Sequence, residues 1–148
     1  MSLRSQFKTS PKLETEGVWL ELGNTRIRLA RAGGQNQKYN AAMEKVSKLH
    51  RRAIENELLS SEKSLAILRD VYADTVVLDW ETNIGTEDNP NWVEGIEPET
   101  PGADLLPVTR ENIIATFKEL PDLFLECKRT AEKMMYFSQS LLDGTVKN

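Results

Sequence analysis

The sequence predicts an α+β fold that is mainly α: an N-terminal β-hairpin followed by a small bundle of about four helices with a long acidic loop. Apolar and polar residues alternate on both sides of a Gly23-Asn24 pair, which is the pattern of a hairpin. After Gly34 the apolar residues recur every three or four positions, which is the pattern of packed helices. Residues 82–107 show neither period and contain Gly, Pro and many acids, so they are predicted to form a loop.

The length and composition predict one folded domain. The chain has 148 residues, of which 39% are hydrophobic, so it has enough apolar material for a single core but not for two large domains. Residues 1–15 contain few apolar side chains, and we expect them to form a flexible N-terminal arm. Residues 16–148 are expected to form a single helical domain with the hairpin at its start.

The cysteine content and the lack of long apolar runs indicate that the protein is cytoplasmic. One cysteine, Cys127, cannot form an intramolecular disulfide, which excludes a secreted disulfide scaffold. The apolar stretches are only a few residues long, and the start of the chain lacks the apolar run of a signal peptide. We therefore expect a cytoplasmic protein that does not enter a membrane.

The hairpin is predicted with a defined register around the Gly23-Asn24 turn. Counting outward from the turn gives the opposite pairs Leu22 with Thr25, Leu20 with Ile27, Val18 with Leu29, Glu21 with Arg26 and Trp19 with Arg28. One face is apolar, whereas the other carries an ion pair and a cation–π pair. Because an isolated hairpin is marginally stable in water, its apolar face is expected to rest on the helices or on a partner.

The helical part is predicted as two antiparallel helices before the loop and two helices after it. The first helix spans about residues 36–58, and the second begins after an N-cap at Ser60-Ser61 and ends around Trp80. After the loop, Thr109 is the N-cap of a short helix. Pro121 suits the first turn of a last helix, whose apolar stripe continues to Leu141 or Leu142 before a C-cap at Gly144.

The chain lacks the residues that common catalytic and cofactor sites require. With one histidine, His50, and one cysteine, it cannot supply the four ligands of a common zinc site. His50 lies beside arginines on the polar flank of a helix, and Cys127 lies on an apolar stripe, so we interpret them as a surface imidazole and a buried thiol. No phosphate-binding glycine loop or helix–loop–helix calcium motif is present. We expect no enzymatic activity, no cofactor and no metal.

The charge of the chain is strongly polarised along the sequence. Residues 1–69 contain 13 basic and 7 acidic residues, whereas residues 70–109 contain no base and 10 acids. The first segment could attract nucleic acid or an acidic protein, and the second repels phosphate. Because the acidic segment cancels the field of the basic one and the pI is about 5.2, nucleic acid is not the partner that we expect.

Two motifs flank the acidic loop and resemble a known family. Residues 76–81 read Val-Val-Leu-Asp-Trp-Glu, and residues 108–114 and 120–124 read Val-Thr-Arg-Glu-Asn-Ile-Ile and Leu-Pro-Asp-Leu-Phe. This pattern, over about residues 65–136, resembles the tail assembly chaperones of long-tailed bacteriophages. The resemblance implies a helix that ends in a Trp-containing segment, a variable loop, and a Leu-Pro-x-Leu-Phe helix.

The resemblance also implies a function and its partners. Such a chaperone binds the tape-measure protein, and in addition the tail-tube protein, in the cytoplasm of the infected bacterial host and is absent from the mature virion. A long helical partner with an apolar face would be bound by apolar helix surface flanked by charge. The candidate partner-binding residues are Trp80, Trp92, Met134, Met135, Tyr136 and Phe137.

Alternative interpretations of these residues and of the function remain open at this point. Residues 134–137 are four large side chains in a row, which can equally be core and boundary residues of a helix. Trp80 is the residue that the resemblance singles out, yet it can also close the second helix onto the last one. The alternative function is a virion structural component, such as a tail-completion or connector protein, whose hairpin and N-terminal arm contact neighbouring subunits.

Overall fold

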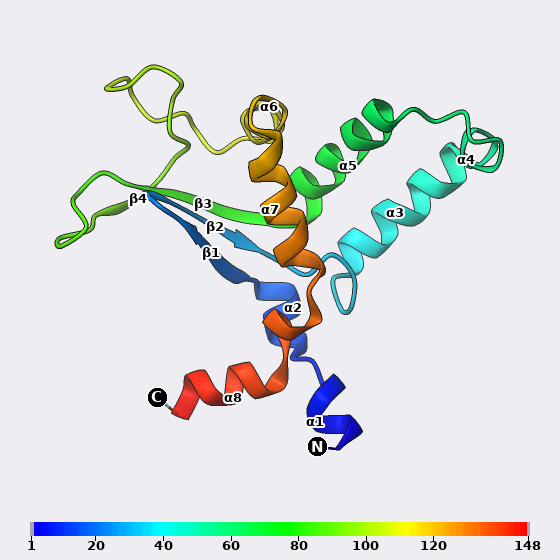
Figure 1. The fold of residues 1–148 in the computed structure, drawn as a ribbon, viewed down its shortest axis with the longest axis horizontal. Helices are drawn as coiled ribbons and strands as arrows, with labels where there is room; N and C mark the ends of the chain where they lie inside the picture. The colour runs from blue at the N-terminus through cyan, green and yellow to red at the C-terminus, as the bar shows by residue number, and fades with distance from the viewer. Residues whose placement is uncertain (1, 148) are drawn as a thin grey trace.

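The computed structural model describes residues 2–147, with side chains as far as Asp143, and its centre is a four-stranded antiparallel sheet in the order β1-β2-β3-β4. Helices cover one face of this sheet, and a helical hairpin extends away from it (Figure 1). The strands are β1 (Val18–Leu22), β2 (Thr25–Leu29), β3 (Val77–Asn83) and β4 (Trp92–Glu94). The helices are α1 (Leu3–Phe7), α2 (Pro11–Glu16), α3 (Gln37–Leu49), α4 (Arg51–Glu55), α5 (Ser61–Thr75), α6 (Arg110–Glu119), α7 (Pro121–Glu132), the 3-10 helix η1 (Met134–Phe137) and α8 (Gln139–Lys147).

The predicted fold class, a hairpin followed by a helical bundle, is therefore wrong. The hairpin is only half of a sheet, because β3 pairs with β2 from the middle of the chain and β4 pairs with β3. The strands are spread between helices along the sequence rather than gathered at the N-terminus. The apolar face of the hairpin does rest on helices, but it reaches them as part of a wider sheet.

The predicted hairpin and its register are confirmed. Leu20 lies opposite Ile27 and Val18 opposite Leu29, and Gly23 occupies the turn with a φ of 62°. The residue at position 23 must tolerate this left-handed backbone, which glycine does without steric cost. The predicted ion pair is different, since Arg26 binds Glu81 on β3 rather than its cross-strand neighbour Glu21.

The second predicted helix ends earlier than expected, and the segment around Trp80 is a strand. The α5 helix ends at Thr75, and β3 begins at Val77. The acids Asp79 and Glu81 alternate along β3 and lie opposite Arg28 and Arg26 of β2. Two charge pairs and a row of main-chain hydrogen bonds therefore favour pairing with β2 over another turn of helix.

The predicted loop at residues 82–107 contains regular structure. It includes β4, and beyond it Ile96 and Leu106 exchange two main-chain hydrogen bonds of 2.9 and 2.8 Å. Ile96 is 1% exposed and belongs to the core. The loop between Ile96 and Leu106 is therefore closed by hydrogen bonds between its two ends. The turn between β3 and β4 is likewise closed by the pairing of these two strands.

Helix boundaries follow the capping residues where the sequence has them. Ser60 caps α5 and Thr109 caps α6, each by accepting a main-chain N–H, as predicted. The first predicted helix is interrupted at His50, which separates α3 from α4. The last predicted helix ends at Glu132, because Lys133 is extended and lets Phe137 of η1 turn into the interior. Gly144, the predicted cap, lies within α8.

The core lies between the sheet and the helices α5, α6 and α7. Its centre is a series of aromatic rings: Tyr72 meets Phe124 at 5.4 Å between ring centroids, Phe124 meets Phe117 at 5.0 Å, and Phe117 meets Trp80 at 5.8 Å. Ile27 and Leu29 contribute the β2 side of the same cluster. Burial of these large apolar surfaces is the main stabilising contribution to such a fold.

The N-terminal segment that we expected to be a flexible arm contains α1 and α2. Ser10 and Glu14 are each 1% exposed. The Glu14 carboxylate accepts hydrogen bonds from the Thr9 hydroxyl at 2.9 Å and from Arg31 at 2.6 Å, and the Ser10 N–H donates to the Phe137 carbonyl at 2.8 Å. Residues 9–16 are therefore tied both to the end of β2 and to η1.

Candidate functional site

The six predicted partner-binding residues lie on three different surfaces. Trp80 points to the helix-covered side of the sheet, Trp92 to the opposite side, and residues 134–137 form η1 beside the N-terminal helices. The sequence motif that contains Trp80 and the methionine-rich segment therefore do not form a single site. Each surface has a distinct chemistry.

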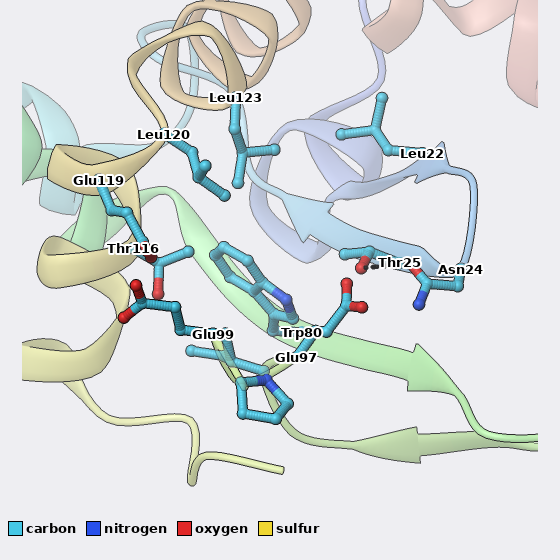
Figure 2. A pocket seen from close by; sticks show the side chains of 12 residues that line it. Leu22, Asn24, Thr25, Trp80, Glu97, Glu99, Thr116, Glu119, Leu120 and Leu123 are labelled. Carbon is cyan, nitrogen blue, oxygen red and sulfur yellow. Dashed lines mark hydrogen bonds between the residues drawn. The ribbon is translucent and has the colours of Figure 1, made fainter. Parts of the chain in front are cut away.

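Trp80 forms the floor of a groove at the end of the sheet where β1 turns into β2 (Figure 2). The groove has a volume of about 400 Å³ and lies between this turn, the segment after β4, and the junction of α6 and α7. Its lining, which we call the Trp80 groove, consists of Leu22, Asn24, Thr25, Trp80, Ile96, Glu97, Pro98, Glu99, Thr116, Glu119, Leu120 and Leu123. The indole itself is 2% exposed and packs on Phe117, so most of its surface serves the core.

The Trp80 groove combines an apolar floor with unpaired polar groups. The carboxylates of Glu97, Glu99 and Glu119 border it, and within the described residues none of them has a basic side chain at ion-pair distance. The Trp80 Nε1–H is buried and has no acceptor in the described structure. Glu97, Glu99 and Glu119 are exposed, so their carboxylates are open to an approaching cationic group. The groove is thus suited to a cationic partner with an apolar contact group.

The face of the sheet opposite the helices, here called the outer face, carries paired charges and two tryptophans. Arg26 binds Glu81 at 2.6 Å, and Arg28 donates from Nε to Asp79 at 2.6 Å. The Arg26 guanidinium also lies between two rings, 4.8 Å from the centroid of Trp19 and 4.6 Å from that of Trp92. Each of these contacts stabilises the sheet internally.

Trp92 was predicted to bind a partner, and in the structure its ring contacts Arg26. The sequence pattern alone did not reveal that Trp19 and Arg26 hold this ring. The sequence did contain a sign that these two segments pair. Arginines stand two positions apart at 26 and 28, and acids stand two positions apart at 79 and 81, so two neighbouring antiparallel strands can form both ion pairs at once.

Residues 134–137 divide between the interior and the surface. Phe137 is fully buried, so it belongs to the core rather than to a contact surface. Met135 is 64% exposed and Tyr136 38% exposed. Met134 and Met135 line a groove of about 550 Å³ together with Phe7 and the polar residues Ser5, Gln6, Ser138 and Ser140, and we call this set the terminal groove.

The contribution of α1 to the terminal groove was missed because residues 1–15 were interpreted as an arm. Leu3 and Phe7 are 75% and 59% exposed and lie one helical turn apart. The signal in the sequence was Ser2, which accepts a hydrogen bond from the Ser5 N–H and caps this helix. An N-cap followed by two apolar residues four positions apart indicates a short amphipathic helix.

The single histidine and cysteine lie away from all three surfaces. Cys127 is fully buried, and burial raises the pKa of its thiol from 9.0 to about 12, so the thiol stays protonated and is a poor nucleophile at neutral pH. His50 lies between α3 and α4.

Among residues 2–147, no group of three or more His, Cys, Asp or Glu side chains is arranged to hold a metal ion. No helix in this range is long and apolar enough to cross a bilayer.

The fold is that of a small α+β protein whose surface carries two grooves, the Trp80 groove and the terminal groove. A family model described as YdaY prophage protein matches residues 34–148. The chain therefore belongs to the YdaY prophage protein family and is a phage-derived protein. No curated protein and no solved structure matches it.

Proposed function

We propose that this protein is a phage tail assembly chaperone that holds the tape-measure protein, and in addition the tail-tube protein, without catalysing a reaction. It would act in the cytoplasm of the infected host and leave before the virion is complete. Membership of a prophage protein family supports the phage setting. The motifs at residues 76–81 and 120–124 support the assignment to tail assembly by resemblance.

The observation that carries the proposal is the exposure of apolar side chains at the terminal groove. Phe7 and Met135 of this groove are both more than half exposed, and so is Leu3, which lies outside the lining one helical turn before Phe7. A single-chain fold gains nothing from leaving these side chains in water. Methionine side chains are flexible and polarisable, so they adapt to partners of differing shape. The other residues that line this groove are uncharged, namely Ser5, Gln6, Ser138 and Ser140, which suits an apolar helix face.

The experiment is co-expression with the tape-measure protein of the same phage. We expect this chain to raise the soluble fraction of the tape-measure protein and to co-purify with it. Phe7→Asp combined with Met135→Asp should abolish both effects, because two charges would have to be desolvated in the contact. Ile84→Asp is the matched control, since Ile84 is 58% exposed in the turn between β3 and β4 and lies outside the terminal groove.

The outcomes separate this function from its alternative. If the wild-type chain leaves the tape-measure protein insoluble, the proposed function is wrong. If the Phe7 and Met135 variant still solubilises it, the terminal groove is not the contact surface. Mass spectrometry of purified virions gives the second test, because a chaperone is absent from them. Stoichiometric copies of this chain in virions would favour a structural component, such as a tail-completion or connector protein.

A further inference from the structure

We propose that the Trp80 groove binds the α3–α4 tip of a second copy of this chain, so that copies associate head to tail. The tip is the exposed end of the helical hairpin, and we call Lys45, Lys48, Leu49, Arg51 and Arg52 the basic tip. The inference does not rest on the proposed chaperone function. It rests on the chemistry of two surfaces and on where the fold places them.

The Trp80 groove combines acidic and apolar groups that a basic, apolar partner would match. Glu97, Glu99 and Glu119 lack basic partners within the described residues, and the Trp80 Nε1–H, on a side chain that is 2% exposed, lacks an acceptor. Figure 2 shows the indole nitrogen on the side of the ring that faces Thr25 and Glu97. Leu22, Leu120 and Leu123 supply apolar lining beside these polar groups. A ligand that fits must bring positive charge and an apolar side chain.

The basic tip carries the complementary groups. Leu49 is 74% exposed and is flanked by Lys48 and Arg51, and in the described structure Arg51 and Arg52 have no carboxylate at ion-pair distance. Lys48 contacts Glu44 at 3.3 Å, but both side chains are more than two thirds exposed, so this pair contributes little. The basic tip therefore offers an exposed leucine beside basic side chains, and the Trp80 groove offers apolar side chains beside acidic ones.

The positions of the two surfaces require a second copy. In Figure 1, α4 lies at one end of the molecule, and β4 with the loop that follows it lies at the other. The basic tip therefore cannot reach the Trp80 groove of its own chain. Two different surfaces in contact make a heterologous interface, which grows into rings or open chains rather than stopping at a symmetric dimer.

The first test is sedimentation velocity of the wild-type chain at rising concentration and at two ionic strengths. At about 0.01 M salt the screening length is about 30 Å, and at about 1 M it is about 3 Å. We expect the mean sedimentation coefficient to rise with concentration at low salt, and the association constant to fall about tenfold or more at high salt. A chain that stays monomeric at low salt overturns the proposal and leaves the groove to a basic segment of another protein.

The second test separates the two surfaces by mixing variants. The groove variant is Glu97→Gln with Glu99→Gln, and the tip variant is Leu49→Ser with Arg52→Gln. Both variants replace charged side chains with uncharged ones instead of charges of the opposite sign. With reversed charges, the altered groove and the altered tip would attract each other in the mixture, and the two surfaces could not be separated. Each variant alone should be monomeric at a concentration at which the wild type associates. Their equimolar mixture should form dimers and nothing larger, because one intact tip meets one intact groove.

The controls keep the charge change but move it away from the two surfaces. Glu87→Gln with Asp104→Gln alters the same acidic segment outside the groove lining, and Lys12→Gln removes an exposed base on α2. These variants should associate as the wild type does. Association of either surface variant alone, or a mixture that stays monomeric while circular dichroism shows both variants folded, overturns the proposal.

Discussion

At the scale of single residues, Gly34 is constrained by a buried charge. Its φ is +54°, and a Cβ at this position would lie 1.7 Å from Oε2 of Glu14. Glu14 is 1% exposed and binds Arg31 at 2.6 Å. Any side chain at position 34 must therefore displace a buried carboxylate from a cationic partner, in addition to adopting a left-handed backbone.

We predict that Gly34→Ala destabilises the protein more than Gly23→Ala does. Gly23 has a similar φ of +62°, but a Cβ added there would have no atom within 4 Å, so its substitution reports the backbone cost alone, about 1 kcal/mol. Disruption of the Glu14–Arg31 pair should raise the loss for Gly34→Ala to about 3 kcal/mol. Urea denaturation measures both values, and equal losses would show that Glu14 moves aside without cost.

Cys127 and Tyr72 are two buried groups that hold their protons to high pH. Burial raises the pKa of the Cys127 thiol from 9.0 to about 12, and burial, followed by the charge of Glu132, raises the pKa of the Tyr72 hydroxyl above its ordinary 10.0. In the unfolded chain both groups return to their ordinary pKa values. Above pH 9.0 the unfolded state therefore releases a proton that the folded state retains, which favours unfolding.

We predict that the free energy of unfolding falls as the pH rises from 9.0 towards about 12. The Cys127 contribution is full below its unfolded pKa and decreases by up to about 1.4 kcal/mol per pH unit above it. Urea titrations at several pH values measure this slope. In Cys127→Ala the slope should be shallower, and it should steepen again where Tyr72 begins to ionise in the unfolded chain. Identical slopes in the two proteins would exclude the thiol as a source.

At the scale of elements, the sequence was informative where partners are near in the chain. The hairpin register followed from the turn, because each residue pair is fixed by counting outward from Gly23. The β3 strand was misinterpreted as helix because its partner is far away: Arg26 and Glu81 are 55 residues apart. Thr75 and Val76 also continue the apolar stripe of α5, so the local period favours a helix there. Only the pairing with β2 shows that the next residues form a strand.

The candidate surfaces show the same limit. Composition pointed to the methionine-rich segment, but it could not distinguish Phe137, which is fully buried, from Met135, which is 64% exposed. That difference depends on η1, whose geometry is set by hydrogen bonds to residues 8–10. The Trp80 groove draws on four separate segments of the chain. The sequence therefore pointed to Trp80 and to Glu97 and Glu99 of the acidic loop, but not to their meeting in one groove with Leu22 and Glu119.

At the scale of the whole molecule, the two ends of the chain are held together. The Gln139 N–H donates to the Lys8 carbonyl at 3.0 Å, and Thr9 and Ser138 form an isolated antiparallel bridge. Figure 1 shows α1, α2 and α8 on the same side of the sheet. Within this region α2 carries the buried Glu14, whereas α1 has no buried residue. The N-terminal segment therefore divides into an anchored part and an exposed part.

This division predicts different effects for two N-terminal truncations. Removal of residues 1–8 deletes α1 and Phe7 but leaves the contacts of Ser10 and Glu14, so the free energy of unfolding should change by less than about 1 kcal/mol. Removal of residues 1–16 also deletes Glu14 and leaves Arg31, whose side chain is 21% exposed, without its carboxylate. We expect a loss of about 3 kcal/mol in that case.

Urea denaturation and the tape-measure co-expression assay together test this division. The shorter truncation should keep its stability and yet lose the solubilising effect, because it removes Phe7 from the lining of the terminal groove together with the exposed Leu3 beside it. If it is instead as unstable as the longer truncation, α1 contributes to the core and the terminal groove is not a free surface. If it is stable and still solubilises the tape-measure protein, the contact lies elsewhere, and the outer face of the sheet with Trp19 and Trp92 becomes the next surface to substitute.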